Sequence, residues 1–141
     1  MPLPEDPGSI RFHHTGYIVP SIAEAVAGFQ SAMFPGWDGV IVHDPMQMVR
    51  VTFLPANLPD RTTIELVEPA GPRSPVLKFL ESGGGIHHVC FEVEDLKRQL
   101  ATARAAGHTM VRVPMPAPAF GGRRIAWIRT SAGLLVEYLQ R

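Results

Sequence analysis

Hydrophobic and polar positions in the first half of the chain predict one strand, one helix and three further strands. Residues 12–19 read as a strand, and residues 21–33 carry apolar side chains at helical spacing. Ser21 can cap this helix, with Glu24 three positions further on. The apolar stripe consists of Ile22, Ala25, Val26, Phe29 and Met33. Loops rich in Pro, Asn and Asp separate the remaining predicted strands, which are 39–43, 50–54 and 63–67.

The second half repeats this order after a connector. The connector predicts a short helix from Ser74 and Pro75 to about residue 82, which the glycines 83–85 end. Asp95 then caps a longer helix that Gly107 ends, and its apolar face consists of Leu96, Leu100 and Ala103. The predicted strands are 86–93, 109–113, 124–128 and 134–139.

The two halves align as an internal repeat. His14 and His88 lie 74 positions apart, and the same offset matches residues 50–54 with 124–128. Glu65 and Glu137 align at an offset of 72, so the first half has a loop two residues longer. Chance similarity between two stretches of the same strand and helix order is the alternative explanation.

The repeat predicts an α+β fold in which two tandem βαβββ modules form a curved sheet around a metal-binding cleft. We divide the chain into a loose N-terminal segment, a first module, a connector with a short helix, and a second module. Their ranges are 1–11, 12–69, 70–85 and 86–141.

Composition favours a globular protein and argues against polyelectrolyte partners. Hydrophobic residues make up 45% of the 141 positions, which suffices to close one core. Thirteen basic residues balance thirteen acidic ones, so neither nucleic acid nor an anionic membrane is an expected partner. No secretory signal or membrane-spanning apolar run is visible, and Cys90 alone cannot form an internal disulfide. We therefore expect a cytoplasmic location.

Four side chains at matching positions of the repeat are candidates for one metal site. Strand alternation assigns His88 to the more polar face of its strand, and sets Glu65 and Glu137 opposite their apolar neighbours. Alternation does not decide between His13 and His14, and the repeat selects His14. Two imidazoles and two carboxylates suit one divalent ion such as Zn²⁺, Co²⁺, Ni²⁺, Mn²⁺ or Fe²⁺. Two buried carboxylates that face each other would be costly without a cation between them.

Each of these residues also has a plainer interpretation. A single histidine in a strand is more often bonded to a carbonyl, and a single strand glutamate is usually solvated. The metal is favoured because the four residues recur as two equivalent pairs. Cys90, expected on the same face as His88, is either a small buried hydrophobe or a neighbour of the metal.

Several motifs along the chain resemble one branch of a known superfamily. They lie at residues 64–69 (IELVEP), 74–80 (SPVLKFL), 85–93 (GIHHVCFEV), 121–128 (GGRRIAWI) and 134–138 (LLVEY). These motifs resemble the methylmalonyl-CoA epimerase branch of the vicinal oxygen chelate (glyoxalase/bleomycin-resistance/dioxygenase) superfamily, over about residues 12–140. The resemblance implies paired βαβββ modules, and it assigns metal ligation to the same four residues: His14, Glu65, His88 and Glu137.

The resemblance implies a metal-dependent enzyme, an epimerase of 2-acyl-CoA thioesters such as methylmalonyl-CoA. The metal would bind the carboxylate and thioester oxygens together and stabilise the enolate formed when the α-proton leaves. Glu65 and Glu137 are the expected acid and base. Members of this branch often carry Pro-Glu-Gln where this chain has Pro-Met-Gln, so Met46 replaces a candidate acid/base glutamate. Asp44 lies close by in sequence, but on an extended chain it would point differently.

Gln47, Arg123 and Arg124 are the predicted substrate-binding residues. The segment 119–124 reads as a mobile loop near the cleft mouth whose arginines meet an acidic substrate, or as a hairpin with solvated basic residues. A second candidate activity is a glyoxalase-I-like lactoylglutathione lyase or related isomerase, whose substrate would be a glutathione thioester or hemithioacetal. A small-molecule binding or resistance protein without turnover is the alternative of another class. A homodimer is a candidate assembly.

Overall fold

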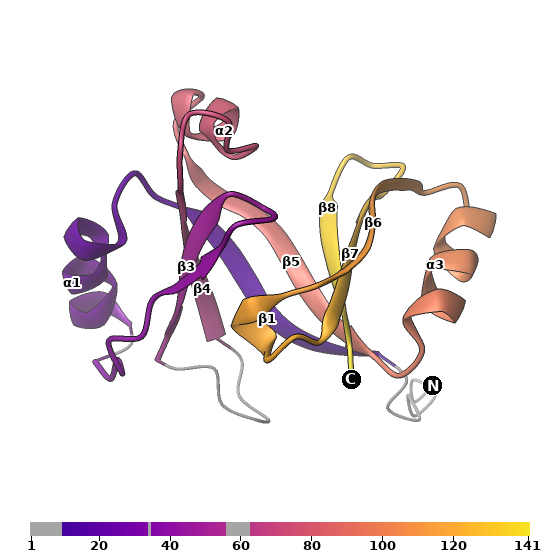
Figure 1. Ribbon diagram of the computed structural model, residues 1–141, viewed down its shortest axis with the longest axis horizontal. Helices are drawn as coiled ribbons and strands as arrows, with labels where there is room; N and C mark the ends of the chain where they lie inside the picture. Colours follow the sequence, from indigo (N-terminus) through magenta and orange to yellow (C-terminus); the bar gives the residue numbers. More distant parts are fainter. Residues whose placement is uncertain (1–9, 34, 56–62) are drawn as a thin grey trace, which may run out of the picture.

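The computed structural model describes residues 10–33, 35–55 and 63–141, and its strands form one eight-stranded sheet. The sheet curves between helices that lie at its two ends (Figure 1). The first five elements are β1 (Ile10–Ile18), α1 (Ile22–Ala32), β2 (Val42–Asp44), β3 (Val49–Leu54) and β4 (Thr63–Pro69). A short α2 (Leu77–Glu81) follows, and then β5 (Gly85–Val93), α3 (Leu96–Ala105), β6 (Thr109–Pro116), the 3₁₀ turn η1 (Pro118–Phe120), β7 (Arg124–Arg129) and β8 (Leu135–Gln140).

The strand order shows the internal repeat directly. It runs β2-β3-β4-β1-β5-β8-β7-β6, so the four strands of one half mirror the four of the other across the β1–β5 boundary. β1 is parallel to β4 and β5 is parallel to β8, while β1 and β5 are antiparallel to each other. The predicted α+β fold with two βαβββ units and one curved sheet is therefore confirmed.

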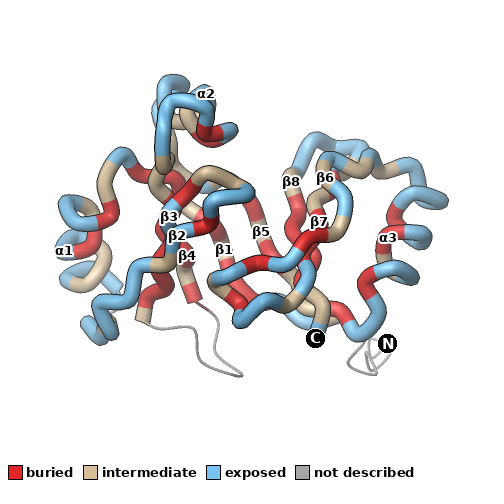
Figure 2. Tube along the Cα trace, viewed as in Figure 1, coloured by how far each residue is buried: buried red, intermediate tan, exposed pale blue. Residues whose placement is uncertain are grey.

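The two long helices form where capping and apolar spacing predict them. The Ser21 side chain accepts a hydrogen bond from the Glu24 amide, and the Asp95 side chain accepts one from the Arg98 amide. The buried face of α1 packs with Val19, Leu54 and Leu66, and that of α3 packs with Ala126, Ile128 and Val136. Figure 2 shows the buried residues along the strands and the exposed outer turns of both helices.

The element ends differ from the predicted ranges at several places. α1 ends at Ala32, and Met33, the last residue of the predicted stripe, is half exposed. The connector helix is only Leu77–Glu81, because the residues before it form turns. β1 already includes Ile10 and Arg11, which were assigned to the loose segment 1–11, and the rest of that segment lies outside the described residues. None of the described helices is long and apolar enough to cross a membrane.

Candidate metal centre and its cavity

Two β-bulges at equivalent positions shape the centre of the sheet. In the pairing of β1 with β5, the register shifts between Phe12 and His14, and again between Gly16 and Tyr17. The first shift leaves His13 without a partner across the ladder, and the second leaves His87 without one. A bulge of this kind places an extra residue in one strand, which lets two consecutive side chains turn toward the same side. Each strand therefore presents a pair of neighbouring histidines to the concave face.

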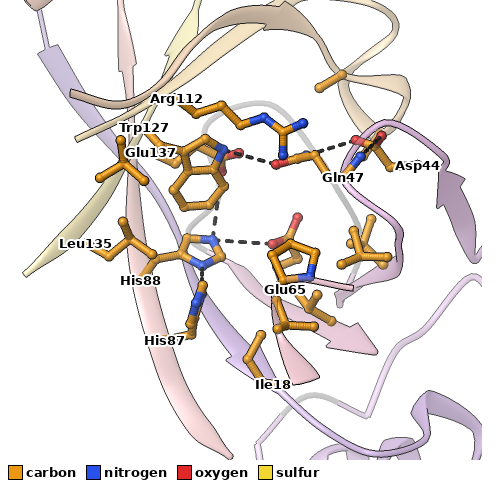
Figure 3. A pocket seen from close by; sticks show the side chains of 18 of the residues that line it. Ile18, Asp44, Gln47, Glu65, His87, His88, Arg112, Trp127, Leu135 and Glu137 are labelled. Carbon is orange, nitrogen blue, oxygen red and sulfur yellow. Dashed lines mark hydrogen bonds and ion pairs between the residues drawn. The ribbon is translucent and has the colours of Figure 1, made fainter. Parts of the chain in front are cut away.

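His14, Glu65, His88 and Glu137 meet at this point from four adjacent strands, β1, β4, β5 and β8. The two Nε2 atoms of the histidines lie 3.2 Å apart. Glu65 Oε1 is 3.5 Å from His14 Nε2 and 3.4 Å from His88 Nε2. Glu137 Oε1 lies 3.3 Å and 3.8 Å from the same two atoms. All four residues are buried, and His88 faces both carboxylates in Figure 3.

These side chains fit a divalent cation. Tetrahedral ligands at zinc-like bond lengths lie about 3.3 Å from one another, close to the separations between the imidazoles and the carboxylates. Ligand atoms of His14, His88 and Glu137 all lie within 4.8 Å of one another, and Glu65 approaches both imidazoles. Among the described residues, buried Glu137 Oε1 has no hydrogen-bond partner. A buried carboxylate oxygen that accepts no hydrogen bond is costly even beside two imidazoles, and a cation would satisfy it.

The charges in this cluster shift the pKa values of its members strongly. Burial lowers the pKa of His14, but Glu65 and Glu137 outweigh burial and raise it to about 9. Burial likewise raises the pKa of Glu65, but His14 and His88 outweigh it and hold that pKa well below its usual value. The Cys90 thiol is buried beside Glu137 and Glu65, and both effects raise its pKa well above the ordinary value. Cys90 therefore stays a protonated thiol near neutral pH.

The pKa values of the two bulge histidines, His13 and His87, are lowered, whereas that of His14 is raised. Burial and the neighbouring His14 lower the pKa of His13 to about 4. Burial and the neighbouring His88 lower the pKa of His87 to about 4 as well. Both imidazoles are therefore neutral at neutral pH.

We call the four residues His14, Glu65, His88 and Glu137 the quartet. The quartet lies beside a cavity of about 250 Å³ that is lined mainly by apolar side chains. Glu65, His88 and Glu137 line it, and its apolar wall includes Ile18, Val49, Val51, Val67, Val76 and Trp127. Its other polar lining residues are Asp44, Gln47, His87, Arg112 and Arg129. A mostly apolar cavity with a few convergent polar groups is typical of a small-molecule site.

A chain of hydrogen bonds crosses the cavity between the two modules (Figure 3). Trp127 Nε1 donates to Gln47 Oε1 at 3.0 Å, and Gln47 Nε2 donates to Asp44 Oδ2 at 2.8 Å. Arg112 Nη2 also donates to the Met46 carbonyl at 3.1 Å. The turn between β2 and β3 is thus tied to β6 and β7 of the other module.

The Pro45-Met46-Gln47 segment forms this turn. Gln47 lines the cavity as predicted, whereas Met46 is half exposed and is not among the lining residues. Contrary to the expectation for an extended chain, Asp44 is buried and lines the cavity. The turn explains this, because the amides of Met46 and Gln47 both donate to Asp44 Oδ1 at 3.0 Å.

Neither arginine predicted to bind substrate lines the cavity. Arg123 Nη1 lies 3.6 Å from Glu92, its guanidinium lies over the Phe120 ring, and Arg124 is exposed. Arg112 and Arg129 line the cavity in their place. The sequence carries no clear signal for them, because the register between β6 and β7 shifts twice along the ladder.

Trp127 is a site residue that the repeat could have revealed. The offset of 74 maps Phe53 onto Trp127. The Phe53 ring lies 5.6 Å from the His14 ring, and the Trp127 ring lies 4.7 Å from the His88 ring. The two aromatic side chains therefore have equivalent places beside His14 and His88, which we call the inner histidines.

Comparison with known proteins agrees with this geometry. A family model described as the Glyoxalase/Bleomycin resistance protein/Dioxygenase superfamily matches residues 13–127. The chain belongs to this superfamily.

Relatives within the superfamily include named epimerases. The ethylmalonyl-CoA/methylmalonyl-CoA epimerase of Cereibacter sphaeroides is 33% identical over 135 residues, which cover 92% of this chain and 97% of that protein. The mitochondrial methylmalonyl-CoA epimerase of Dictyostelium discoideum is 30% identical over 135 residues, covering 90% of this chain and 76% of its own. These relatives confirm the prediction of an enzyme of the epimerase or isomerase kind.

A solved structure shows the same fold. The crystal structure of methylmalonyl-CoA epimerase from Mycobacterium tuberculosis superposes with a TM-score of 0.81 at 21% identity, covering 96% of this chain and 91% of that one. The two chains thus share the same fold.

Proposed function

We propose that the chain is a divalent-metal-dependent epimerase of a 2-acyl-CoA thioester such as methylmalonyl-CoA. The observation that carries the proposal is the convergence of His14, Glu65, His88 and Glu137 at one buried point beside the cavity. Relatives of similar length that are named as epimerases support the choice of reaction.

His14, Glu65, His88 and Glu137 would hold the cation, whose identity among Zn²⁺, Co²⁺, Ni²⁺, Mn²⁺ and Fe²⁺ the donor set leaves open. A bound cation would supply Lewis acidity toward the carbonyl oxygens of the thioester and its carboxylate. The apolar wall excludes water from the acyl group, and Arg112 and Arg129 offer positive charge to the anionic part of the substrate. We assign to these two arginines the role predicted for Arg123 and Arg124.

Inversion of the α-carbon requires one group that removes a proton and another that returns one to the opposite face. Glu65 and Glu137 belong to different modules and both line the cavity, so we assign them these roles. Glu137 Oε1 has no hydrogen-bond partner among the described residues, so it can accept a proton when the carboxylate loosens from the cation. Asp44 is a third carboxylate in the lining, held by the turn at residues 45–48.

Exchange of the substrate α-proton with solvent tests this proposal. Methylmalonyl-CoA is incubated with the protein in D₂O, and deuterium incorporation is followed by mass spectrometry. We expect Glu137→Gln and Glu65→Gln each to slow exchange by at least about 100-fold, because each variant loses a proton-transfer group. Glu81→Gln, on exposed α2, is the matched control and should exchange like the unaltered protein. No exchange by the metal-loaded unaltered protein would refute the epimerase assignment.

One observation favours a second activity on the same site, a glyoxalase-I-like lactoylglutathione lyase or related isomerase. Met46 replaces the acid/base glutamate of epimerase-like sequences, and its side chain is half exposed. The same two glutamates could move a proton within a glutathione hemithioacetal. Turnover of the hemithioacetal of methylglyoxal and glutathione, with no exchange of methylmalonyl-CoA, would select this activity.

A further inference from the structure

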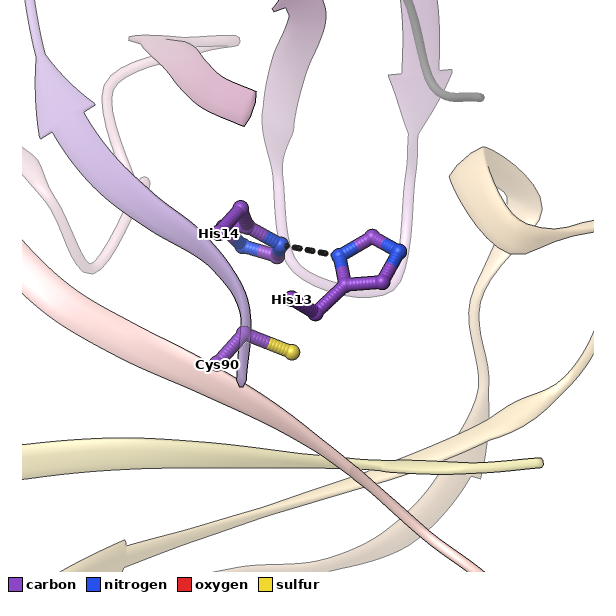
Figure 4. A group of neighbouring side chains, drawn as sticks. All are labelled: His13, His14 and Cys90. Atoms are coloured by element: carbon purple, nitrogen blue, oxygen red, sulfur yellow. Dashed lines mark hydrogen bonds between the residues drawn. The ribbon is translucent and has the colours of Figure 1, made fainter. Parts of the chain in front are cut away.

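Each inner histidine of the quartet is hydrogen-bonded to the histidine that precedes it in its strand. His13 Nδ1 lies 2.8 Å from His14 Nδ1, and His87 Nδ1 lies 2.9 Å from His88 Nδ1. The rings meet edge to face in both pairs, at 78° and 88°. Figure 4 shows the first pair beside Cys90, and Figure 3 shows the second pair at the edge of the cavity.

We propose that His13 and His87 are positioning residues that fix the tautomer and ring orientation of His14 and His88, and thereby set the affinity of the metal centre. The inference rests on the metal site of the proposed function. It goes beyond that function because it assigns a role to two residues outside the quartet.

The role follows from how an imidazole binds a cation. His14 and His88 direct Nε2 toward the quartet, so a neutral ligand ring must carry its proton on Nδ1. That Nδ1–H needs an acceptor, and ligand histidines usually find one in a carboxylate, a carbonyl or water. Here its hydrogen-bond partner is Nδ1 of another imidazole, which accepts when its own proton lies on Nε2. The hydrogen bond then excludes the tautomer that would put a proton where the cation binds.

The same device occurs at the same place in both modules. The bulge residue is His13 in β1 and His87 in β5, and these positions are 74 residues apart, like His14 and His88. Without the bulge, alternation would turn His13 and His87 to the opposite face of the sheet. The two β-bulges match, and each supplies a hydrogen-bond partner to one inner histidine, which supports the same positioning role for His13 and His87.

Aromatic side chains hold the bulge histidines in place. The His13 ring is buried and lies 5.5 Å from the Phe120 ring in an edge-to-face contact. The His87 ring lies 4.8 Å from the Phe79 ring in the same geometry. Each outer imidazole is therefore packed against an apolar ring, which restricts its rotation and keeps its Nδ1 aimed at the inner histidine.

Metal affinity of paired variants tests the inference. His13→Phe and His87→Phe keep an aromatic ring but remove the acceptor, whereas His13→Asn and His87→Asn keep an acceptor oxygen close to the position of Nδ1. We expect the Phe variants to weaken Co²⁺ and Zn²⁺ binding by about 10- to 100-fold, and the Asn variants to stay within a few-fold of the unaltered protein. Affinity is measured by competition with a chromophoric chelator, and exposed His43→Asn is the control. Unchanged affinity in the Phe variants, or an equal loss in the Asn variants, would overturn the role.

A spectroscopic measurement on the unaltered protein keeps the test independent of whether the variants fold. With Zn²⁺ bound, ¹⁵N NMR of the imidazoles should show the proton on Nδ1 of His14 and His88, and on Nε2 of His13 and His87. The reverse assignment would overturn the inference while leaving the metal site intact. If the unaltered protein binds no divalent ion, the metal site of the proposed function fails first, and this inference fails with it.

Discussion

Buried histidines make the stability of the metal-free protein depend on pH in two directions. The pKa of His14 is raised to about 9 in the folded protein, against about 6.5 in the unfolded chain. Protonated His14 therefore stabilises the fold fully below about pH 6.5, and this stabilisation is lost as the pH rises through 9. The pKa values of His13 and His87 are lowered to about 4. As the pH falls from about 6.5 to 4, the unfolded chain therefore binds protons at these two residues that the folded chain does not bind, and the free energy of unfolding decreases. Stability therefore falls on both sides of a maximum.

We predict that the free energy of unfolding of the chelator-treated protein peaks near pH 6.5. The expected loss is on the order of 2 kcal/mol toward pH 9 and again on the order of 2 kcal/mol toward pH 4.5, where the partial exposure of the His87 ring weakens its share. Urea denaturation at half-unit pH steps measures this profile. Replacing His13 and His87 with Asn should flatten the acid side alone, and a flat profile in the unaltered protein would contradict the assignment.

Gly16 lies where the ring of His88 crosses β1. A Cβ atom at this position would stand 1.9 Å from His88 Cε1, so Gly16→Ala must displace that ring. We predict that this variant loses on the order of 1–3 kcal/mol of stability and much of its metal affinity. Gly28→Ala is the matched control, because its added Cβ meets nothing within 4 Å on α1 and alanine favours a helix. Denaturant unfolding of both variants decides the matter, and equal behaviour would show that His88 is not confined as described.

At the scale of elements, the turn between β2 and β3 lines the cavity and is tied to β6 and β7 by hydrogen bonds. Trp127→Phe keeps a ring beside His88 but removes the donor to Gln47, which lies 3.0 Å away. We predict that the variant folds normally and raises KM for methylmalonyl-CoA several-fold, because Gln47 loses one of its two side-chain partners. Steady-state exchange rates at varied substrate concentration measure this effect. An unchanged KM would mean that the link between the modules does not shape the binding site.

The sequence predicts most of these elements because their signals are local. Caps at Ser21 and Asp95 and apolar stripes define both long helices, and the repeat selects His14 over His13. The bulges that turn both histidines of each pair to one face depend on pairing between β1 and β5, which local patterns do not encode. The placement of Asp44, Arg112 and Arg129 also depends on turn and register geometry, so it emerges only from the folded chain.

At the scale of the whole molecule, the site lies at the seam between two related halves. One module contributes His14 and Glu65, and the other contributes His88 and Glu137, so neither has the full ligand set alone. The central strands β1 and β5 join the halves by antiparallel pairing and bring the two pairs together. Metal binding would therefore stabilise the arrangement of the modules as well as the site. A homodimer and a cytoplasmic location stay predictions.

Anomalous diffraction from crystals grown with Co²⁺ tests the central claim most directly. We predict one strong peak per chain about 2.0–2.2 Å from Nε2 of His14 and of His88, and from a carboxylate oxygen of Glu65 and of Glu137. The peak should vanish in Glu137→Gln crystals soaked at limiting Co²⁺ and persist in those of Glu81→Gln. Absence of a peak at the quartet in the unaltered protein, or a peak bound by other residues, would contradict the account.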